Sequence, residues 1–212
     1  MTQREAREIM GKNFIAIDDV ARILSVSISR KARYALQHIP YSDGTLQTCK
    51  KSHILFPGVP EDNSGNLITI ASIRETFGVD FDEQPCFSYV DYWYIDENFA
   101  SKKTCSLRWY LIRKSILPNS RTKSYHEQIR LLRGDEELPS AVEIVYMTFL
   151  YYFVSDGKRL FESSEVLCKD AGWDGRIVTA GSFNNVGLVI SQVKLNDRSK
   201  DLGLAPVLRN DF

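Results

Sequence analysis

The chain has 212 residues, of which 43% are hydrophobic and 25% charged, a composition typical of a globular protein with a sizeable core. Its 27 basic residues balance its 27 acidic residues. A net charge of zero creates no overall field that attracts nucleic acid or an anionic membrane. Nucleic acid is therefore not the expected partner.

The cysteines and the apolar segments indicate the compartment. No CxxC pair and no histidine at zinc-ligand spacing accompanies the four cysteines, so we expect free thiols, no metal and no cofactor; they are Cys49, Cys86, Cys105 and Cys168. The N-terminal segment MTQREAREIMGKNF lacks the apolar run of a signal peptide. The longest apolar stretch, 141–154, is shorter than the roughly 20 residues of a membrane span. We expect a cytoplasmic protein without a membrane span, unless another system exports it.

Two short helices are predicted over residues 18–37, in the segments DDVARILSV and SRKARYALQ. Asp18 or Asp19 supplies the N-cap, and His38-Ile39-Pro40 ends the second helix. Three strands are predicted next, at 53–56, 67–73 and 87–94. The last of these, FSYVDYWY, is dense in aromatic residues, as expected of a strand that is covered on both faces.

The second half carries two capping boxes in which a serine precedes a glutamate by three residues. After a strand at 107–112 and a turn at 118–120, Ser124 and Glu127 predict a helix that ends at Gly134. Ser140 and Glu143 predict a second helix, which is apolar nearly all round. We expect it to be the central buried helix, with five side chains nearly fully buried: Ile144, Val145, Phe149, Leu150 and Phe153.

From residue 160 onward the sequence changes to short strands separated by glycines: FESSEVLCK, GRIVTAGSF, GLVISQV and LGLAPVLR. Strands this closely spaced must pair as an antiparallel meander. Helices followed by a meander predict the α+β class.

The sequence contains no catalytic motif of the nucleotide-binding, serine-hydrolase or metalloprotease type. His126-Glu127 is only the start of an H-E-x-x-H motif, and no second histidine follows it. The three histidines and the scattered carboxylates form no evident acid–base pair. We expect a protein that is not an enzyme.

One alternative function is DNA binding. Residues 18–37 resemble a loose helix-turn-helix whose second helix carries Arg30, Lys31 and Arg33. The competing interpretation is a helical packing unit, because helix pairs with this spacing are common in domains that never touch DNA.

The segment from Trp173 to Arg198 combines apolar and polar positions. The expected inward anchors are Ile177, Phe183, Leu188 and Ile190. The residues between them are a mixture of Arg, Ser, Asn, Gln, Lys and Trp, which is typical of an adaptable polar contact surface. The competing interpretation is that these polar residues are the solvent face of a sheet.

Six ordered motifs carry a resemblance that extends from Gly11 to the C-terminus: GKNFIAIDDVA, IPYSDGTLQTCKKSHILFPGVP, WYLIRKSILPNSRTKSYHEQIRLL, ELPSAVEIVY, GKRLFESSEVLC and LGLAPVLR. The chain resembles a family of uncharacterised bacterial proteins. The ending of that family resembles the variable region of targets of diversity-generating retroelements, which display exchanged residues on a C-type-lectin-like fold.

The resemblance implies a helical and aromatic-rich portion at 1–100 and a C-type-lectin-like portion at 101–212, made of two helices and an antiparallel meander. It implies a non-catalytic ligand-binding protein with an unknown protein or glycan ligand. The ligand-binding positions carried over are Trp173, Arg176, Val178, Ser182, Asn185, Val186, Val189, Ser191, Gln192, Val193, Lys194, Asn196, Ser199 and Lys200. The chain departs from the family at Cys168-Lys169-Asp170, at Thr179-Ala180 and in its last four residues. These departures weaken the assignment of single positions.

A second alternative is an enzyme related to lectin-fold oxidases. Such an enzyme needs a reactive cysteine pair, for which Cys105 and Cys168 are the candidates.

Overall fold

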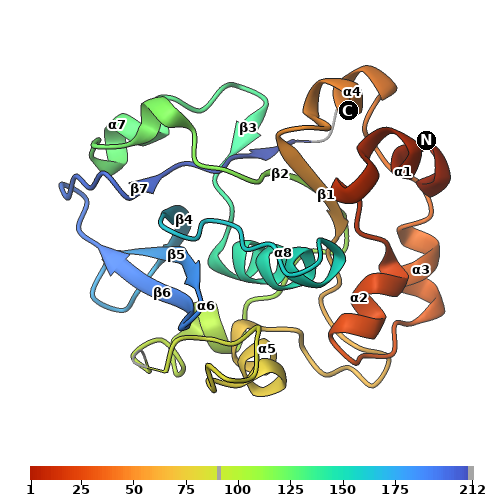
Figure 1. Ribbon diagram of the computed structural model, residues 1–212, viewed down its shortest axis with the longest axis horizontal. Helices are drawn as coiled ribbons and strands as arrows, with labels where there is room; N and C mark the ends of the chain where they lie inside the picture. Colours follow the sequence, from red (N-terminus) through yellow and green to blue (C-terminus); the bar gives the residue numbers. More distant parts are fainter. Residues whose placement is uncertain (90–91, 210–212) are drawn as a thin grey trace.

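The structure is a computed structural model that describes residues 1–89 and 92–209, and it belongs to the α+β class (Figure 1). The first half contains α1 (Gln3–Met10), the 3₁₀ turn η1 (Gly11–Asn13), α2 (Ile17–Ile23), α3 (Arg30–Ala35), α4 (Asp43–Cys49), β1 (His53–Pro57), α5 (Ile70–Phe77) and α6 (Asn98–Ser101). The second half contains β2 (Trp109–Arg113), η2 (Pro118–Ser120), α7 (Tyr125–Ile129), β3 (Glu136–Glu137), α8 (Ala141–Val154), β4 (Glu165–Ala171), β5 (Ile177–Asn184), β6 (Gly187–Val193), β7 (Leu202–Gly203) and β8 (Val207–Leu208).

Two sheets organise the molecule. The first has the strand order β1-β2-β8-β3 and is antiparallel throughout. The second has the order β6-β5-β4-β7, in which β4, β5 and β6 form the predicted antiparallel meander and β7 adds to β4 in parallel. The segment LGLAPVLR is therefore not one strand of the meander, because its two ends, β7 and β8, belong to different sheets.

Helix α8 lies at the centre of the molecule, between the second sheet and the N-terminal helices (Figure 1). It begins as the capping box predicts, because the Glu143 carboxylate accepts the backbone N–H of Ser140 at 2.7 Å. Ile144, Val145, Phe149 and Leu150 are all fully buried, which confirms the prediction for them. The prediction for Phe153 is wrong, since this side chain is 40% exposed near the end of the helix. In the described residues, no helix has the length and apolar character of a membrane span.

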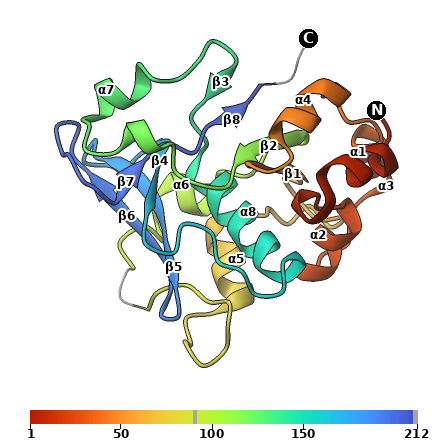
Figure 2. The same ribbon diagram turned by 45° about the horizontal axis from the view of Figure 1, so that its top comes forward.

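The expected division at residue 100 is crossed by both the first sheet and the core. Strand β1 pairs with β2 along its whole length, from His53 opposite Arg113 to Pro57 opposite Trp109. The main apolar cluster includes side chains from Ala6 to Leu208. Figure 2 shows β8, near the end of the chain, beside β2 and close to α4. The N-terminal helices and the first sheet therefore share one core with the second half.

Two strand predictions in the first half are wrong. Residues 67–73 lead into α5, because Thr69 is a helix N-cap whose hydroxyl accepts the Ser72 backbone N–H at 3.1 Å. The segment 87–94 is not a strand in its described residues, and residues 90 and 91 lie outside them. Phe87 makes a single parallel bridge to Leu188, and Trp93 and Tyr94 lie in a turn. Phe87 and Tyr94 are buried in the main core, whereas Tyr89 and Tyr92 are exposed.

The helix predicted after Ser124 begins where expected but is short. Glu127 accepts hydrogen bonds from the backbone N–H and the hydroxyl of Ser124, at 2.8 and 2.7 Å. The helix ends at Ile129 and does not reach Gly134. Ile129 and Leu132 instead pack against a second, smaller apolar cluster under the meander.

Candidate ligand-binding surface

The meander positions the predicted site residues. In β5 and β6, Ile177 pairs with Val193 and Gly181 with Val189. The turn between them is fixed at Gly187, which has φ +105 and where an added Cβ would lie 2.4 Å from the backbone of Phe87. Glycine is required at position 187 because the backbone at Phe87 and Ser88 lies too close to the turn for any side chain.

The four predicted anchors are buried. Ile177 is 8% exposed, Leu188 is 1% exposed, and Phe183 and Ile190 are fully buried. They do not share one face, because Ile177 joins the smaller cluster whereas the other three join the main core. The meander is therefore covered on both of its faces, since both clusters include β4 residues as well.

The predicted site residues fall into three classes of exposure. Exposed residues are Trp173, Arg176, Asn185, Val186, Lys194, Asn196 and Lys200. Half-buried residues are Ser182, Val189, Ser191, Gln192, Val193 and Ser199. Val178 is fully buried in the main core, so its inclusion is corrected: the central strand β5 has no open face from which this side chain could meet a ligand.

The exposed members lie at two opposite ends of the β5–β6 hairpin. Trp173 and Arg176 occupy the β4–β5 turn, and Lys194 follows the end of β6 on the same side, because Ile177 pairs with Val193. Asn185 and Val186 occupy the turn at the other end. A strand of this length separates the two ends by roughly 20 Å. The predicted positions therefore do not form one continuous flat surface.

Segment 194–200 is fixed to the start of α7 through its backbone. The carbonyl of Leu195 accepts the Tyr125 N–H at 3.0 Å, and that of Ser199 accepts the Thr122 N–H at 2.9 Å. Arg198 forms an ion pair with Glu127 at 2.8 Å. The backbone is thus held while Lys194, Asn196 and Lys200 project into solvent.

A hollow of about 450 Å³ lies at the Trp173 end of the meander and is lined by Trp173, Trp93, Asp96, Glu97 and Asn98. Trp173 is 87% exposed. Its backbone N–H donates to Glu97 Oε1 at 3.2 Å. The Trp93 indole N–H donates to the carbonyl of Ile190 at 3.1 Å. Trp93 is thereby fixed against the free edge of β6, and the two indoles share one hollow.

The charges of this hollow are negative. Arg176 forms an ion pair with Asp174 at 3.1 Å inside the β4–β5 turn. Among the described residues, no cation forms an ion pair with Asp96 or Glu97. An aromatic hollow with two carboxylates favours a neutral hydroxyl-rich or a cationic ligand over an anionic one.

Four residues of the hollow come from the first half and were missed by sequence reasoning: Trp93, Asp96, Glu97 and Asn98. The available signal was the dense aromatic and acidic segment YWYIDEN, of which only the first three residues were interpreted as the end of a strand. Its position beside Trp173 follows from the way the segment covers β6: Ser88 N–H donates to Leu188 O, and Leu188 N–H to Cys86 O, both at 2.9 Å.

The DNA-binding alternative rests on α2 and α3. Both helices form, but α3 has only 6 residues. The predicted N-cap of the first helix is wrong: α2 begins at Ile17 after Ala16, and Asp19 lies in its first turn, where its carboxylate accepts the Ala16 backbone N–H at 3.0 Å. Arg30 and Lys31 are exposed, and Arg33 is paired with Asp18 at 2.6 Å. Of the three side chains expected to bind DNA phosphates, Arg33 is thus already neutralised by a carboxylate of the protein.

The oxidase alternative requires an accessible thiol pair. Cys105 and Cys168 are unpaired and fully buried. Burial raises the pKa of both thiols well above its ordinary value. Neither side chain has the exposure or the thiolate character of a reactive cysteine.

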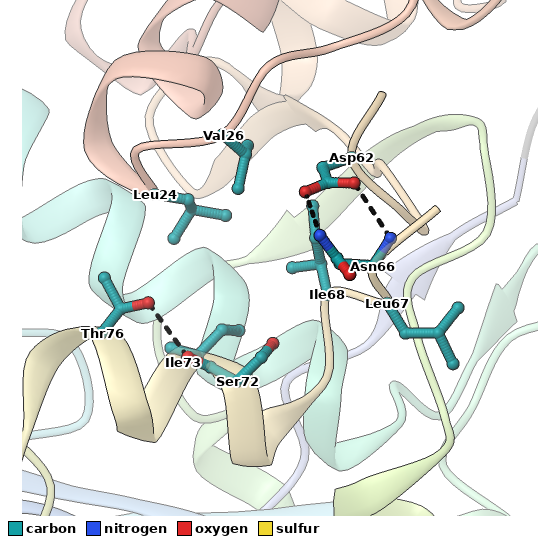
Figure 3. Close-up of a pocket in the computed structure, with 9 residues that line it drawn as sticks. All are labelled: Leu24, Val26, Asp62, Asn66, Leu67, Ile68, Ser72, Ile73 and Thr76. Atoms are coloured by element: carbon teal, nitrogen blue, oxygen red, sulfur yellow. Dashed lines mark hydrogen bonds between the residues drawn. The ribbon is translucent and has the colours of Figure 1, made fainter. Parts of the chain in front are cut away.

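A smaller hollow of about 90 Å³ lies between the loop after β1 and α5 (Figure 3). Its polar groups are hydrogen-bonded to one another: Asp62 accepts the Asn66 side-chain amide at 2.8 Å, and the Thr76 hydroxyl donates to the carbonyl of Ser72 at 3.0 Å. We interpret this hollow as a gap in the packing of the loop and not as a binding site.

Comparison of the chain with protein-family models, with curated proteins and with solved structures finds no match.

Proposed function

We propose that the protein is a non-catalytic ligand-binding protein whose binding surface is centred on Trp173. The observation that carries this proposal is the 87% exposure of Trp173 beside a hollow that also contains Trp93 and two carboxylates. A large aromatic side chain held in water by an ordered turn is typical of a contact residue.

The chemistry of the hollow defines the ligand class. Indole faces stack against the apolar face of a sugar ring, while carboxylate and amide oxygens accept hydrogen bonds from its hydroxyl groups. We therefore propose a neutral glycan as the ligand, with a basic protein segment as the second candidate, because the same carboxylates attract lysine and arginine.

The proposal is tested by screening the protein on a glycan array and then measuring its affinity for the glycans that bind by fluorescence titration. Trp173→Ala should weaken binding by at least about tenfold, as the loss of a central aromatic contact does. The matched control is Tyr34→Ala, which removes an aromatic side chain that is 80% exposed on α3. Retained binding in Trp173→Ala, or equal loss in both variants, would falsify the proposed surface. Binding of basic peptides in place of glycans favours the second ligand class.

We also propose that residues from 101 onward form a C-type-lectin-like portion whose exposed loops are exchanged by a retroelement. The packing of the meander against α8 supports this proposal, as does the solvent exposure of Trp173, Arg176, Lys194 and Asn196. Sequencing of the locus in sister strains tests it. Substitutions should concentrate at these exposed positions next to a reverse-transcriptase gene, and uniform variation along the chain contradicts the proposal.

A reducing compartment, such as the cytoplasm, is the proposed location. It is supported by the four cysteines, which are all buried and unpaired. Alkylation of fresh protein without reductant should modify all four thiols after unfolding, whereas two or more protected thiols contradict this location.

A further inference from the structure

A second cavity, remote in sequence from the Trp173 hollow, lies at one end of the first sheet. It has a volume of about 380 Å³, and its chemically active lining consists of Cys49, Ser52, His53, Arg113, Arg133 and Glu136. These residues come from the end of α4, from β1 and β2, and from the segment that leads into β3.

The register of β1 and β2 brings the central pair together. His53 is the first residue of β1 and lies directly opposite Arg113, the last residue of β2. Residues directly opposite one another in an antiparallel pair project to the same face of the sheet. The His53 Nδ1 is 2.8 Å from the Ser52 hydroxyl. His53 is only 7% exposed, and burial together with the charge of Arg113 lowers its pKa to about 4. The imidazole is therefore neutral at pH 7.

The two arginines of the cavity differ in their partners. Arg133 forms ion pairs with Asp135 at 3.4 Å and with Glu136 at 3.1 Å. The second carboxylate oxygen of Glu136 accepts the Arg133 backbone N–H at 3.0 Å. Both oxygens of the carboxylate that lines the cavity are thus already engaged by Arg133.

Arg113 has no such partner. Within residues 1–89 and 92–209, its guanidinium forms neither an ion pair nor a hydrogen bond, and its Nε is buried without a partner. A half-buried guanidinium loses hydration without gaining a counter-charge, which is unfavourable. A negatively charged ligand in the cavity would supply the missing charge.

We propose that this cavity binds a small oxyanion, a phosphate or carboxylate group, through Arg113. A guanidinium binds both oxygens of such a group in a planar, two-bond arrangement. The side-chain amide of Asn119 lines the same cavity and can donate to the remaining oxygens. The Thr48 hydroxyl, in contrast, already donates to the carbonyl of Gly44 at 2.9 Å, and the Ser52 hydroxyl lies within hydrogen-bond distance of the Cys49 carbonyl and of His53 Nδ1. Leu117 and Leu131 provide an apolar wall for the rest of the ligand. This site is independent of the glycan surface.

Thermal unfolding at constant ionic strength tests the proposal, with inorganic phosphate and acetate as probes and chloride as the reference salt. We expect a saturable rise of the melting temperature with phosphate or acetate. Arg113→Met should weaken the apparent affinity by at least about tenfold, and Arg113→Lys should restore part of it because the charge remains. The matched control is Arg130→Met, at an exposed arginine outside the cavity, which should respond as the native chain does.

Cys49 provides a readout in the unmodified protein. It lines the cavity and is 7% exposed, whereas Cys86, Cys105 and Cys168 are fully buried. Phosphate should slow the alkylation of Cys49 by several-fold and leave the other three thiols unchanged. This measurement applies even if Arg113→Met does not fold. An unsaturable response, an equal response in Arg113→Met, or no protection of Cys49 overturns the proposal.

Discussion

Asp170, the residue before the last in β4, accepts the backbone N–H of Ala141 through its Oδ2 at 2.7 Å. Ala141 is the first residue of α8, so a carboxylate of the meander binds the positive end of the central helix. The other carboxylate oxygen lies 2.6 Å from Lys103 Nζ. Asp170 is 1% exposed. This contact fixes the sheet that carries the proposed ligand-binding loops to its supporting helix.

Replacement of Asp170 by Ala should therefore destabilise the fold by about 3 kcal/mol, because it leaves a buried N–H unpaired and removes the buried carboxylate that binds the half-exposed Lys103. Denaturant unfolding measures the change. The control is Asp156→Asn, which alters an ion pair to Lys12 whose two side chains are both exposed, and it should change stability by less than about 0.5 kcal/mol. Equal effects of the two substitutions contradict the role of Asp170.

Phe149→Ala should cost roughly 3–5 kcal/mol, since the fully buried ring leaves a cavity that its neighbours cannot fill. The ring lies 4.7 Å from that of Phe77 and 4.8 Å from that of Phe87, measured between centroids. Phe153→Ala is the control on the same helix and should cost less, because Phe153 is 40% exposed. A loss below about 1 kcal/mol for Phe149→Ala contradicts the central position of α8.

The exposed loop positions should tolerate substitution. Polar replacements at Arg176, Asn185, Lys194 and Asn196 should each change stability by no more than about 0.5 kcal/mol. Substitution of Phe183 or Ile190 by Ala should cost roughly 2–5 kcal/mol because both are fully buried. A combined change at the four polar positions should leave the melting temperature nearly constant while altering ligand binding. Unfolding of the combined variant would show that these side chains are structural.

His53 should make the stability depend on pH. Its pKa falls from 6.5 to about 4 on folding, chiefly through burial and then through Arg113. The unfolded chain therefore binds the proton more tightly, so this stabilising contribution is complete above pH 6.5 and is lost as the pH falls toward 4. The loss is on the order of 3 kcal/mol.

Urea unfolding of the native chain and of His53→Gln between pH 7 and pH 4 measures this contribution. The native chain should lose more stability over this interval than the variant, because the carboxylates that also titrate there are common to both. Equal losses show that the imidazole is not held in its neutral form by the fold.

Local signals in the sequence were sufficient for several elements. The capping boxes at Ser124 and Ser140 set the starts of α7 and α8, because a cap involves residues only three positions apart. Glycine-separated apolar runs likewise predicted β4, β5 and β6 and their antiparallel order. The run at 67–73 was misread, since a short apolar segment has no period that separates a strand from the start of a helix.

Both candidate sites depend on contacts that no local pattern contains. Trp93 lines the same hollow as Trp173 because its indole binds the edge of β6. This position depends on β6 being the outermost strand of the meander. His53 lies opposite Arg113 because β1 and β2, which are far apart in the sequence, pair in the register that joins the first residue of one strand to the last residue of the other. The starts of α7 and α8 were thus determined by the local sequence. The partner of each side chain was decided by long-range packing, whose energy is summed over the whole core.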